Sequence, residues 1–231
     1  MIPLHDDNPT RTTPIVTIGI IALCTVAFLW QIGHSEQARQ YIAYSLGFVP
    51  AVALGGRQLP PELHVLPAGL TAFTAMFLHG GWLHLIGNML YLWIFGDNVE
   101  EAMGHRRFLI FYLLCGLAAA LAQGLSAPQS TIPMIGASGA IAGVLGAYLL
   151  LHPRARVLVL VPLGFFFFTV FIPAAVVLGV WFLLQLLSSA SMNPNEGGVA
   201  FFAHVGGFLA GLALIPFFRR RGVRLWAPPR R

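Results

Sequence analysis

One serine and one histidine stand out because each lies among small residues inside an apolar stretch. Ser138 is the third residue of the sequence GASG, and His204 is followed by Val-Gly-Gly. A serine hydroxyl becomes a nucleophile when an imidazole nitrogen lies within about 2.6–3.2 Å and takes its proton. A lone serine in a glycine-rich apolar helix is usually a packing residue, whereas an ionisable histidine in such a helix usually has a function. The pair predicts nucleophilic catalysis if the two stretches lie side by side.

A second set of polar residues could stabilise the charge that such a reaction creates. His84 and Asn88 are four residues apart and therefore share one face of a helix. Attack on a peptide carbonyl develops an oxyanion, and fixed donors in a low-dielectric site can contribute several kcal/mol there. His84 and Asn88 supply such donors, and the backbone N–H of Ser138 could supply another. His79 is either a further donor or an interfacial histidine.

The elements that must position these residues are membrane spans. The chain is 57% hydrophobic and 9% charged, which leaves too few polar groups to cover a surface that faces water. About 20 apolar residues cross a bilayer, and the sequence contains six apolar stretches. These stretches are Pro14–Gly33, Leu78–Phe95, Phe108–Leu125, Ile135–Leu151, Val157–Leu187 and Val199–Phe218. The predicted fold is therefore an all-α polytopic membrane protein with six transmembrane helices.

The fifth stretch does not fit a single span. As one helix it would be about 46 Å long, well beyond the thickness of the hydrocarbon core. Pro162, Gly164 and Pro173 also interrupt it. We expect its first third to be an interfacial or re-entrant segment and the span itself to lie near Pro173–Leu187.

Topology brings the candidate residues to one depth. The second, fourth and sixth spans all run in the same direction, and Ser138 and His204 each lie within about one turn of a span's start. His84 and Asn88 lie near the same depth, so the four side chains can meet. No carboxylate occurs within Ile135–Leu151 or Val199–Phe218, so the predicted chemistry uses a Ser-His dyad without an acidic third member.

Small residues in the fourth and sixth spans would allow their backbones to approach closely. Glycines four residues apart form the small-xxx-small pattern that lets helices pack tightly in lipid. The predicted packing residues around the site are Gly136, Gly139, Gly143, Gly207 and Gly211.

Arginine placement predicts the orientation, because cytoplasmic flanks of membrane proteins collect positive charge. With the N-terminus inside, eleven of the 13 basic residues fall on the inner side, and only Arg39 and Arg57 fall outside. The chain then divides into a cytoplasmic segment (1–13), a membrane domain (14–218) and a basic cytoplasmic tail (219–231). Because the tail directly follows a span, it fits a juxtamembrane anchor better than a nucleic-acid-binding segment.

These motifs together resemble the signatures of rhomboid proteases. The resemblance rests on three patterns in order: the His79, His84 and Asn88 pattern, the sequence GASG around Ser138, and Ala203-His204 with its following glycines. It covers nearly the whole chain after Thr12, and the chain resembles the six-span bacterial form. The first outer loop (34–77) is similar to the membrane-embedded loop of that family, and the fifth span with the Ser188–Gly198 loop is similar to its gate and cap.

The resemblance implies an intramembrane serine endopeptidase that hydrolyses transmembrane protein substrates. Ser138 would attack, His204 would be the base, and His84, Asn88 and His79 would stabilise the oxyanion. No cofactor, metal or nucleic acid is expected. The expected location is the bacterial inner membrane, with both termini cytoplasmic and the active site open to the outer face.

Two differences from some family members concern the surroundings of the site. An aromatic residue often follows the nucleophile by one turn and stacks on the catalytic histidine, whereas this chain has Ala142 there. The first outer loop also lacks a Trp-Arg pair that parts of the family contain.

Two other functions remain open at this stage. A rhomboid-like pseudoprotease would bind transmembrane clients without cutting them, but that class typically loses the serine or the histidine. A transporter would show internal repeats and discontinuous helices around a midplane site, and the sequence shows no repeat.

Overall fold

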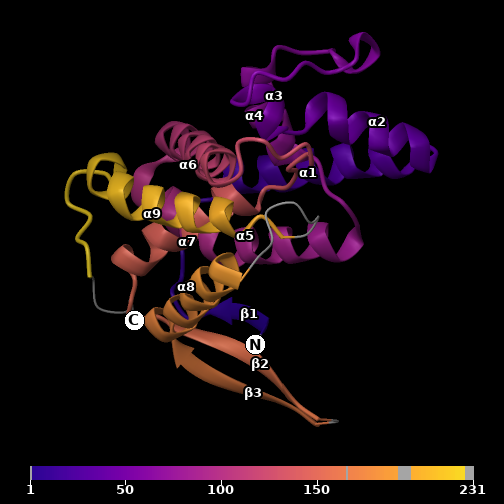
Figure 1. Ribbon diagram of the computed structural model, residues 1–231. Coiled ribbons are helices and arrows are strands. Elements are labelled where there is room, and N and C mark those ends of the chain that lie inside the picture. The colour runs from indigo at the N-terminus through magenta and orange to yellow at the C-terminus, as the bar shows by residue number, and fades with distance from the viewer. Residues whose placement is uncertain (1, 165, 192–198, 227–231) are drawn as a thin grey trace.

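The computed structural model describes residues 2–164, 166–191 and 199–226 (Figure 1). Residues 192–198 of the predicted cap loop and residues 227–231 of the basic tail lie outside these ranges. Within the described residues, a long helix lies in each of the six apolar stretches. These helices are α1 (Ile15–Ile32), α5 (Trp82–Met103), α6 (His105–Ser126), α7 (Ser138–Leu151), α8 (Ala174–Ser191) and α9 (Phe201–Phe218).

Length and composition allow four helices of the described chain to cross a membrane, namely α1, α6, α8 and α9. The apolar helix α7 is shorter, with 14 residues. Helix α5 has 22 residues and carries acidic side chains toward its C-terminal end. The helical membrane bundle predicted from the sequence is thereby confirmed.

Helix α7 lies at the centre of the bundle, which explains how so short a helix is held. Eleven of its 14 residues are buried, and it packs against α9, α6 and α5 (Figure 1). Its small side chains allow these neighbours to approach. A Cβ added to Gly207 would lie 1.9 Å from the carbonyl oxygen of Gly139, and one added to Gly211 would lie 2.0 Å from that of Gly143. Only glycine fits at Gly207 and Gly211, so α7 and α9 are in backbone contact.

The segment between α1 and α5 folds into short helices beside the bundle (Figure 1). Ser35 caps the first of these, because its side chain accepts a hydrogen bond from the backbone N–H of Ala38. The segment is tied to the loop before α7 through a β-bridge between Phe48 and Met134. Its elements are α2 (Glu36–Leu46), α3 (Pro50–Ala53), η1 (Pro61–Leu63), α4 (Ala68–Thr74) and η2 (Ala75–Phe77).

About the first half of the fifth apolar stretch forms strands, which the sequence analysis did not predict. β2 (Arg156–Leu163) and β3 (Phe166–Pro173) form an antiparallel hairpin, and β1 (Ile2–Asp6) pairs with the other edge of β2. β3 consists almost entirely of β-branched and aromatic residues, and β2 has valine at every second position from 157 to 161; such residues favour extended structure. The span follows as α8, close to the position predicted for it.

The end of the bundle that carries this sheet also carries a set of paired polar side chains, and we call it the sheet end. Glu100 near the end of α5 is 1% exposed. Its two carboxylate oxygens accept hydrogen bonds from the backbone N–H groups of Val16 and Thr17 and from the Thr17 hydroxyl, and one contacts His105 Nδ1 at 2.6 Å. These bonds fasten the start of α1 to the junction of α5 and α6.

The N-terminal segment and the start of the C-terminal tail join the same end. Asp6 accepts a hydrogen bond from the Tyr148 hydroxyl near the end of α7, and Asp7 pairs with Arg156 at 2.7 Å. The backbone N–H of Arg220 donates to the carbonyl of Ala102 at the end of α5. Both flanking segments therefore lie at the sheet end.

Candidate active site

Ser138 and His204 lie together at the opposite end of the bundle, where α5, α7 and α9 begin. The distance between Ser138 Oγ and His204 Nε2 is 2.8 Å, within the range for proton transfer. Ser138 is the first residue of α7, and His204 lies in the first turn of α9. The backbone contact between Gly139 and Gly207 brings these two helix starts close enough for the hydrogen bond.

A residue that the sequence analysis did not select holds the other nitrogen of this imidazole. His204 Nδ1 donates to Gln185 Oε1 across 2.7 Å, and Gln185 lies in the second turn from the end of α8. With the hydrogen on Nδ1, the lone pair of Nε2 faces the Ser138 hydroxyl and can accept its proton. The available signal was the presence of one amide side chain inside an otherwise apolar span.

Two aromatic rings contact the histidine, Phe201 of α9 edge-on at 6.4 Å and a nearer one from α8. Trp181 lies one turn before Gln185, and its ring centroid is 5.8 Å from that of His204. Position 142, where the sequence has alanine instead of the aromatic residue often found in this family, is buried in the core. In this chain α8, and not α7, therefore supplies the nearer ring beside the histidine.

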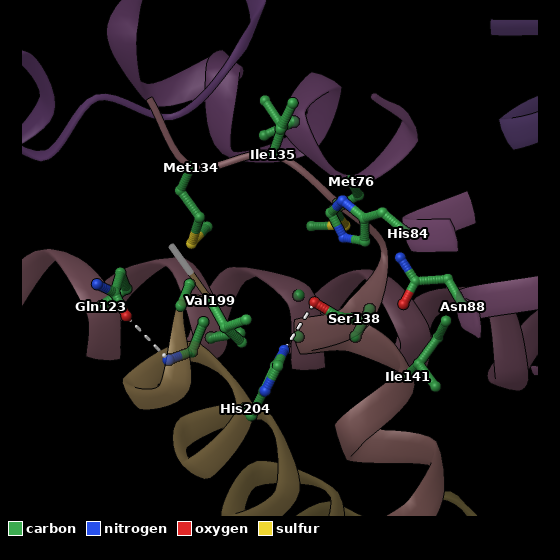
Figure 2. Close-up of a pocket in the computed structure, with 18 of the residues that line it drawn as sticks. Met76, His84, Asn88, Gln123, Met134, Ile135, Ser138, Ile141, Val199 and His204 are labelled. Atoms are coloured by element: carbon green, nitrogen blue, oxygen red, sulfur yellow. Dashed lines mark hydrogen bonds between the residues drawn. The ribbon is translucent and has the colours of Figure 1, made fainter. Parts of the chain in front are cut away.

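His84 and Asn88 approach Ser138 from α5, on the side away from His204 (Figure 2). A Cβ added to Gly136, two residues before the serine, would lie 2.6 Å from His84 Nε2 and 3.8 Å from Asn88 Nδ2. Gly136 has a φ of +127°, which an L side chain rarely adopts, so glycine is required both by conformation and by space. The loop before α7 therefore runs directly past the two donors.

Asn88 is 8% exposed, and its Nδ2 atom has no hydrogen-bond partner among the described residues. A buried donor without a partner costs about 1–3 kcal/mol unless water or a ligand satisfies it. The backbone N–H of Ser138 belongs to the first turn of α7, where helices leave four N–H groups without partners inside the helix. These donors face the region beside the serine hydroxyl.

His79 lies behind His84. Its ring is buried, and the two imidazole centroids are 5.2 Å apart in an edge-on arrangement. The backbone N–H of His79 donates to Gln31 Oε1 on α1. Among the described residues that line the cavity beside Ser138, His84 is present and His79 is not. His79 therefore supports His84 by packing.

Ser138, His204, His84 and Asn88 line a cavity of about 690 Å³. We call this end of the bundle the cavity end. Its walls come from α5, α6, α7 and α9, the loop before α7, the short helices α3, α4 and η2, and Trp181 of α8, and they are mostly apolar. Gln123 of α6 also lines it, and its Oε1 accepts from the backbone N–H of Ala203 at 3.3 Å, which caps the start of α9 (Figure 2). The few polar groups converge on Ser138, as expected for a binding or catalytic site.

The described residues contain no group of three or more His, Cys, Asp or Glu side chains that could hold a metal ion. A hydroxyl next to a correctly oriented imidazole, with unpaired donors beside it, can carry out acyl transfer.

Comparisons with known proteins show which proteins this chain is similar to. Residues 68–221 match the model of the Rhomboid domain. Similar proteins include Rhomboid-like protein 11, chloroplastic, of Arabidopsis thaliana (28% identical over 162 residues, 66% of this chain and 53% of that protein). Rhomboid protease GluP of Bacillus subtilis (strain 168) is 36% identical over 141 residues, which cover 61% of this chain and 25% of that protein. The matches with these two relatives thus span about half of the first and a quarter of the second.

Proposed function

The chain belongs to the rhomboid family, and on that premise we propose that it is an intramembrane serine endopeptidase with Ser138 as nucleophile and His204 as general base. The observation that carries the proposal is the 2.8 Å contact between Ser138 Oγ and His204 Nε2. The relative GluP, which bears the name of a rhomboid protease, supports the reaction class.

The first half of the reaction forms an acyl-enzyme. Ser138 Oγ attacks the carbonyl carbon of the substrate while its proton moves to His204 Nε2. The negative charge on the carbonyl oxygen is stabilised by Asn88 Nδ2, by His84 and by the backbone N–H of Ser138. When the intermediate collapses, the C–N bond breaks and His204 gives its proton to the leaving amine.

In the second half of the reaction, water hydrolyses the acyl-enzyme. His204 removes a proton from a water molecule that attacks the acyl carbon, and the returning proton restores the Ser138 hydroxyl as the new carboxylate leaves. Gln185 accepts from Nδ1 throughout, so the imidazole keeps one orientation while Nε2 gains and loses a proton. The reaction uses four proton transfers through one nitrogen, two in each half, and requires no acidic side chain.

The position of the cavity supports membrane-protein substrates. The cavity lies within the helical bundle, near the starts of three helices, so a substrate segment would enter from the bilayer or its surface. A peptide bond inside a helix is shielded by the helix's own hydrogen bonds and side chains. We therefore propose that the substrate is a transmembrane segment that unwinds beside Ser138.

For the orientation, we propose that the sheet end is cytoplasmic and that the cavity end faces the outside of a bacterial inner membrane. The arginine distribution supports this assignment, because the basic flanks of the described chain lie at the sheet end. Arg154, Arg156 and Arg219–Arg221 are all placed there. The predicted division at residues 13 and 218 stays a prediction.

Fluorophosphonate labelling and cleavage of a transmembrane reporter would test the proposal in reconstituted vesicles. The wild type should react and cleave, and Ser138→Ala should lose both the label and roughly 10⁴-fold or more of the cleavage rate. Ser126→Ala, which removes a hydroxyl bonded to the Gln123 carbonyl at the end of α6, is the matched control and should retain both.

Two results would contradict the protease. Equal labelling of wild type and Ser138→Ala would show that this serine is not the nucleophile. Reporter binding by a wild type that neither reacts nor cleaves would instead support the client-binding pseudoprotease.

A further inference from the structure

The hairpin of β2 and β3 exposes a group of large apolar side chains at its far end. Phe166 is 79% exposed, Phe167 68%, Leu163 67% and Phe168 47%. Figure 1 shows the hairpin projecting away from the helices beyond β1, so no helix covers this end. Exposed apolar groups of this size on a folded protein mark a surface that contacts something apolar.

The exposed side chains lie on both faces of the hairpin. Side chains alternate between the faces of a strand, so Phe166 and Phe168 point to one face and Phe167 to the other. An antiparallel sheet with one face in water normally alternates apolar and polar residues. This part of β3 does not alternate, and neither face is packed on the protein. An apolar medium on both sides therefore fits the sequence better than water on one side.

The backbone limits how deep the hairpin can lie. β1 pairs with β2 only as far as Leu160, so beyond that point both outer edges of the hairpin have unpaired N–H and C=O groups. Open sheet edges are not tolerated in the hydrocarbon core of a bilayer. The tip extends about 10 Å beyond Leu160 at about 3.3 Å per residue, which is close to the immersion of interfacial elements, about 5–10 Å.

The hairpin connects the end of α7 to the start of α8, so its base lies where two helices of the bundle end and begin. The exposed Arg154 lies two residues before β2. An arginine there can contact lipid phosphates while the aromatic rings reach the acyl chains. We propose that the β2–β3 hairpin is a lipid-inserting finger at the sheet end, with the acyl chains of the adjacent leaflet as its partner. The finger is independent of the proposed protease activity.

Spin labelling in lipid vesicles would test this assignment. Cys24 and Cys115 are both buried, so Cys24→Ala and Cys115→Ala give a background for single labels. Nitroxides would be attached after Phe166→Cys or Phe167→Cys in protein reconstituted into phosphatidylcholine and phosphatidylglycerol (three to one). Collision rates with oxygen, which concentrates in lipid, and with a water-soluble nickel chelate would then be measured. Leu209→Cys on the exposed face of α9 is the lipid reference, and Arg224→Cys in the exposed tail is the aqueous reference.

The finger predicts that both hairpin labels behave like the label at position 209, with high oxygen and low nickel accessibility. Using two positions tests both faces of the strand. High nickel accessibility at either position, like that at 224, would overturn the proposal, because that face would be in water. Low accessibility to both reagents would also overturn it, because a protein surface, such as a second copy of the chain, would then cover the hairpin.

Discussion

The two ends of the helical bundle both bury polar side chains, and Glu100 at one end differs from Asn88 at the other, although Asn8 Oδ1 and Arg219 Nε at the sheet end also lack a partner among the described residues. At the sheet end, the buried carboxylate of Glu100 receives hydrogen bonds from α1 and contacts His105. At the cavity end, Asn88 Nδ2 is buried and has no partner in the part of the chain that the structure describes, and the Ser138–His204 pair lies in an open cavity.

The difference separates stability from function. A buried carboxylate is tolerated only when several donors satisfy it, and those same bonds then fix the elements that supply them. A buried donor left unpaired lowers stability, so its retention indicates a ligand or transition state that pairs with it later. Substitutions at the sheet end should therefore change folding, and those at the cavity end should change turnover.

The largest contrast is expected between two asparagines on α5. Asn88→Ala should lower kcat by roughly 10- to 1000-fold, the range for one oxyanion donor, with little change in thermal stability. Asn98→Ala, at the sheet end, removes the acceptor of a hydrogen bond from Asn8 and should lower the melting temperature while the folded protein keeps its kcat. For each variant, reporter cleavage measures kcat and thermal unfolding in detergent measures the melting temperature. If Asn88→Ala weakened substrate binding but left kcat intact, the oxyanion assignment would be wrong.

Glu100→Ala should produce the largest loss of stability. It leaves the N–H groups of Val16 and Thr17 without their acceptor, and breaking a buried charged network costs roughly 3–5 kcal/mol. Glu101→Ala, the adjacent and less buried carboxylate, is the matched control and should cost less. Unfolding by denaturant in micelles would measure the difference in stability between the two variants. Similar losses would contradict the claim that the buried Glu100 stabilises the fold more than Glu101 does.

Substitutions of Gln185 would test whether its hydrogen bond to His204 affects catalysis by orienting the imidazole. Gln185→Leu should lower kcat by about 10- to 100-fold, the value of one hydrogen bond to a charged group, because Nδ1 of His204 loses its acceptor. Gln185→Glu keeps an acceptor and should retain more activity. Nitrogen NMR of labelled histidine should show the Nδ1–H tautomer in the wild type and a mixture in Gln185→Leu. An unchanged tautomer in a slow variant would indicate a purely structural effect.

The smallest expected effect is a pH dependence at the sheet end. Burial raises the pKa of Asp6 to about 6, against about 3.9 in an unfolded chain. The folded state therefore binds the proton more tightly, and wild-type stability should fall as pH rises from about 4 to about 6. Relative to Asp6→Asn, the wild-type melting temperature should drop over this window. A difference that stays constant with pH would contradict the raised pKa.

Asp7 gives the control of opposite sign. Burial acts to raise its pKa, but hydrogen bonds and charge from Arg156 outweigh burial and lower the pKa. The unfolded chain then binds the proton more tightly, so this contribution is present above about pH 3.9 and is lost as pH falls below it. Asp7→Asn should therefore cost stability at neutral pH and little in acid.

Sequence reasoning located the helices and predicted that Ser138 and His204 lie together, because both predictions depend on short-range patterns. Apolar length gives the spans, and equal distance from parallel span starts brings Ser138 and His204 to one depth. Trp181 and Gln185 escaped prediction because their contact with His204 depends on the rotation of α8 about its own axis. No residue pattern in the sequence fixes that rotation.

The strands escaped for a different reason. A continuous apolar run with prolines fits a buried strand, an interfacial segment or a broken helix equally well. The deciding contact, between β1 and β2, joins segments far apart in sequence. The bonds to Glu100 depend in the same way on long-range packing of α1 against α5.

That pairing between β1 and β2 has a consequence for how the protein is made. Pro3 pairs with Val159, so the first strand leaves the ribosome long before its partner is synthesised. At about 5–20 residues per second, the delay is roughly 10–30 s. Throughout that interval the first four spans are delivered to the membrane while the N-terminal strand stays unpaired. The sheet can therefore form only after synthesis has passed α7. A chain truncated before β2 has no partner strand for β1.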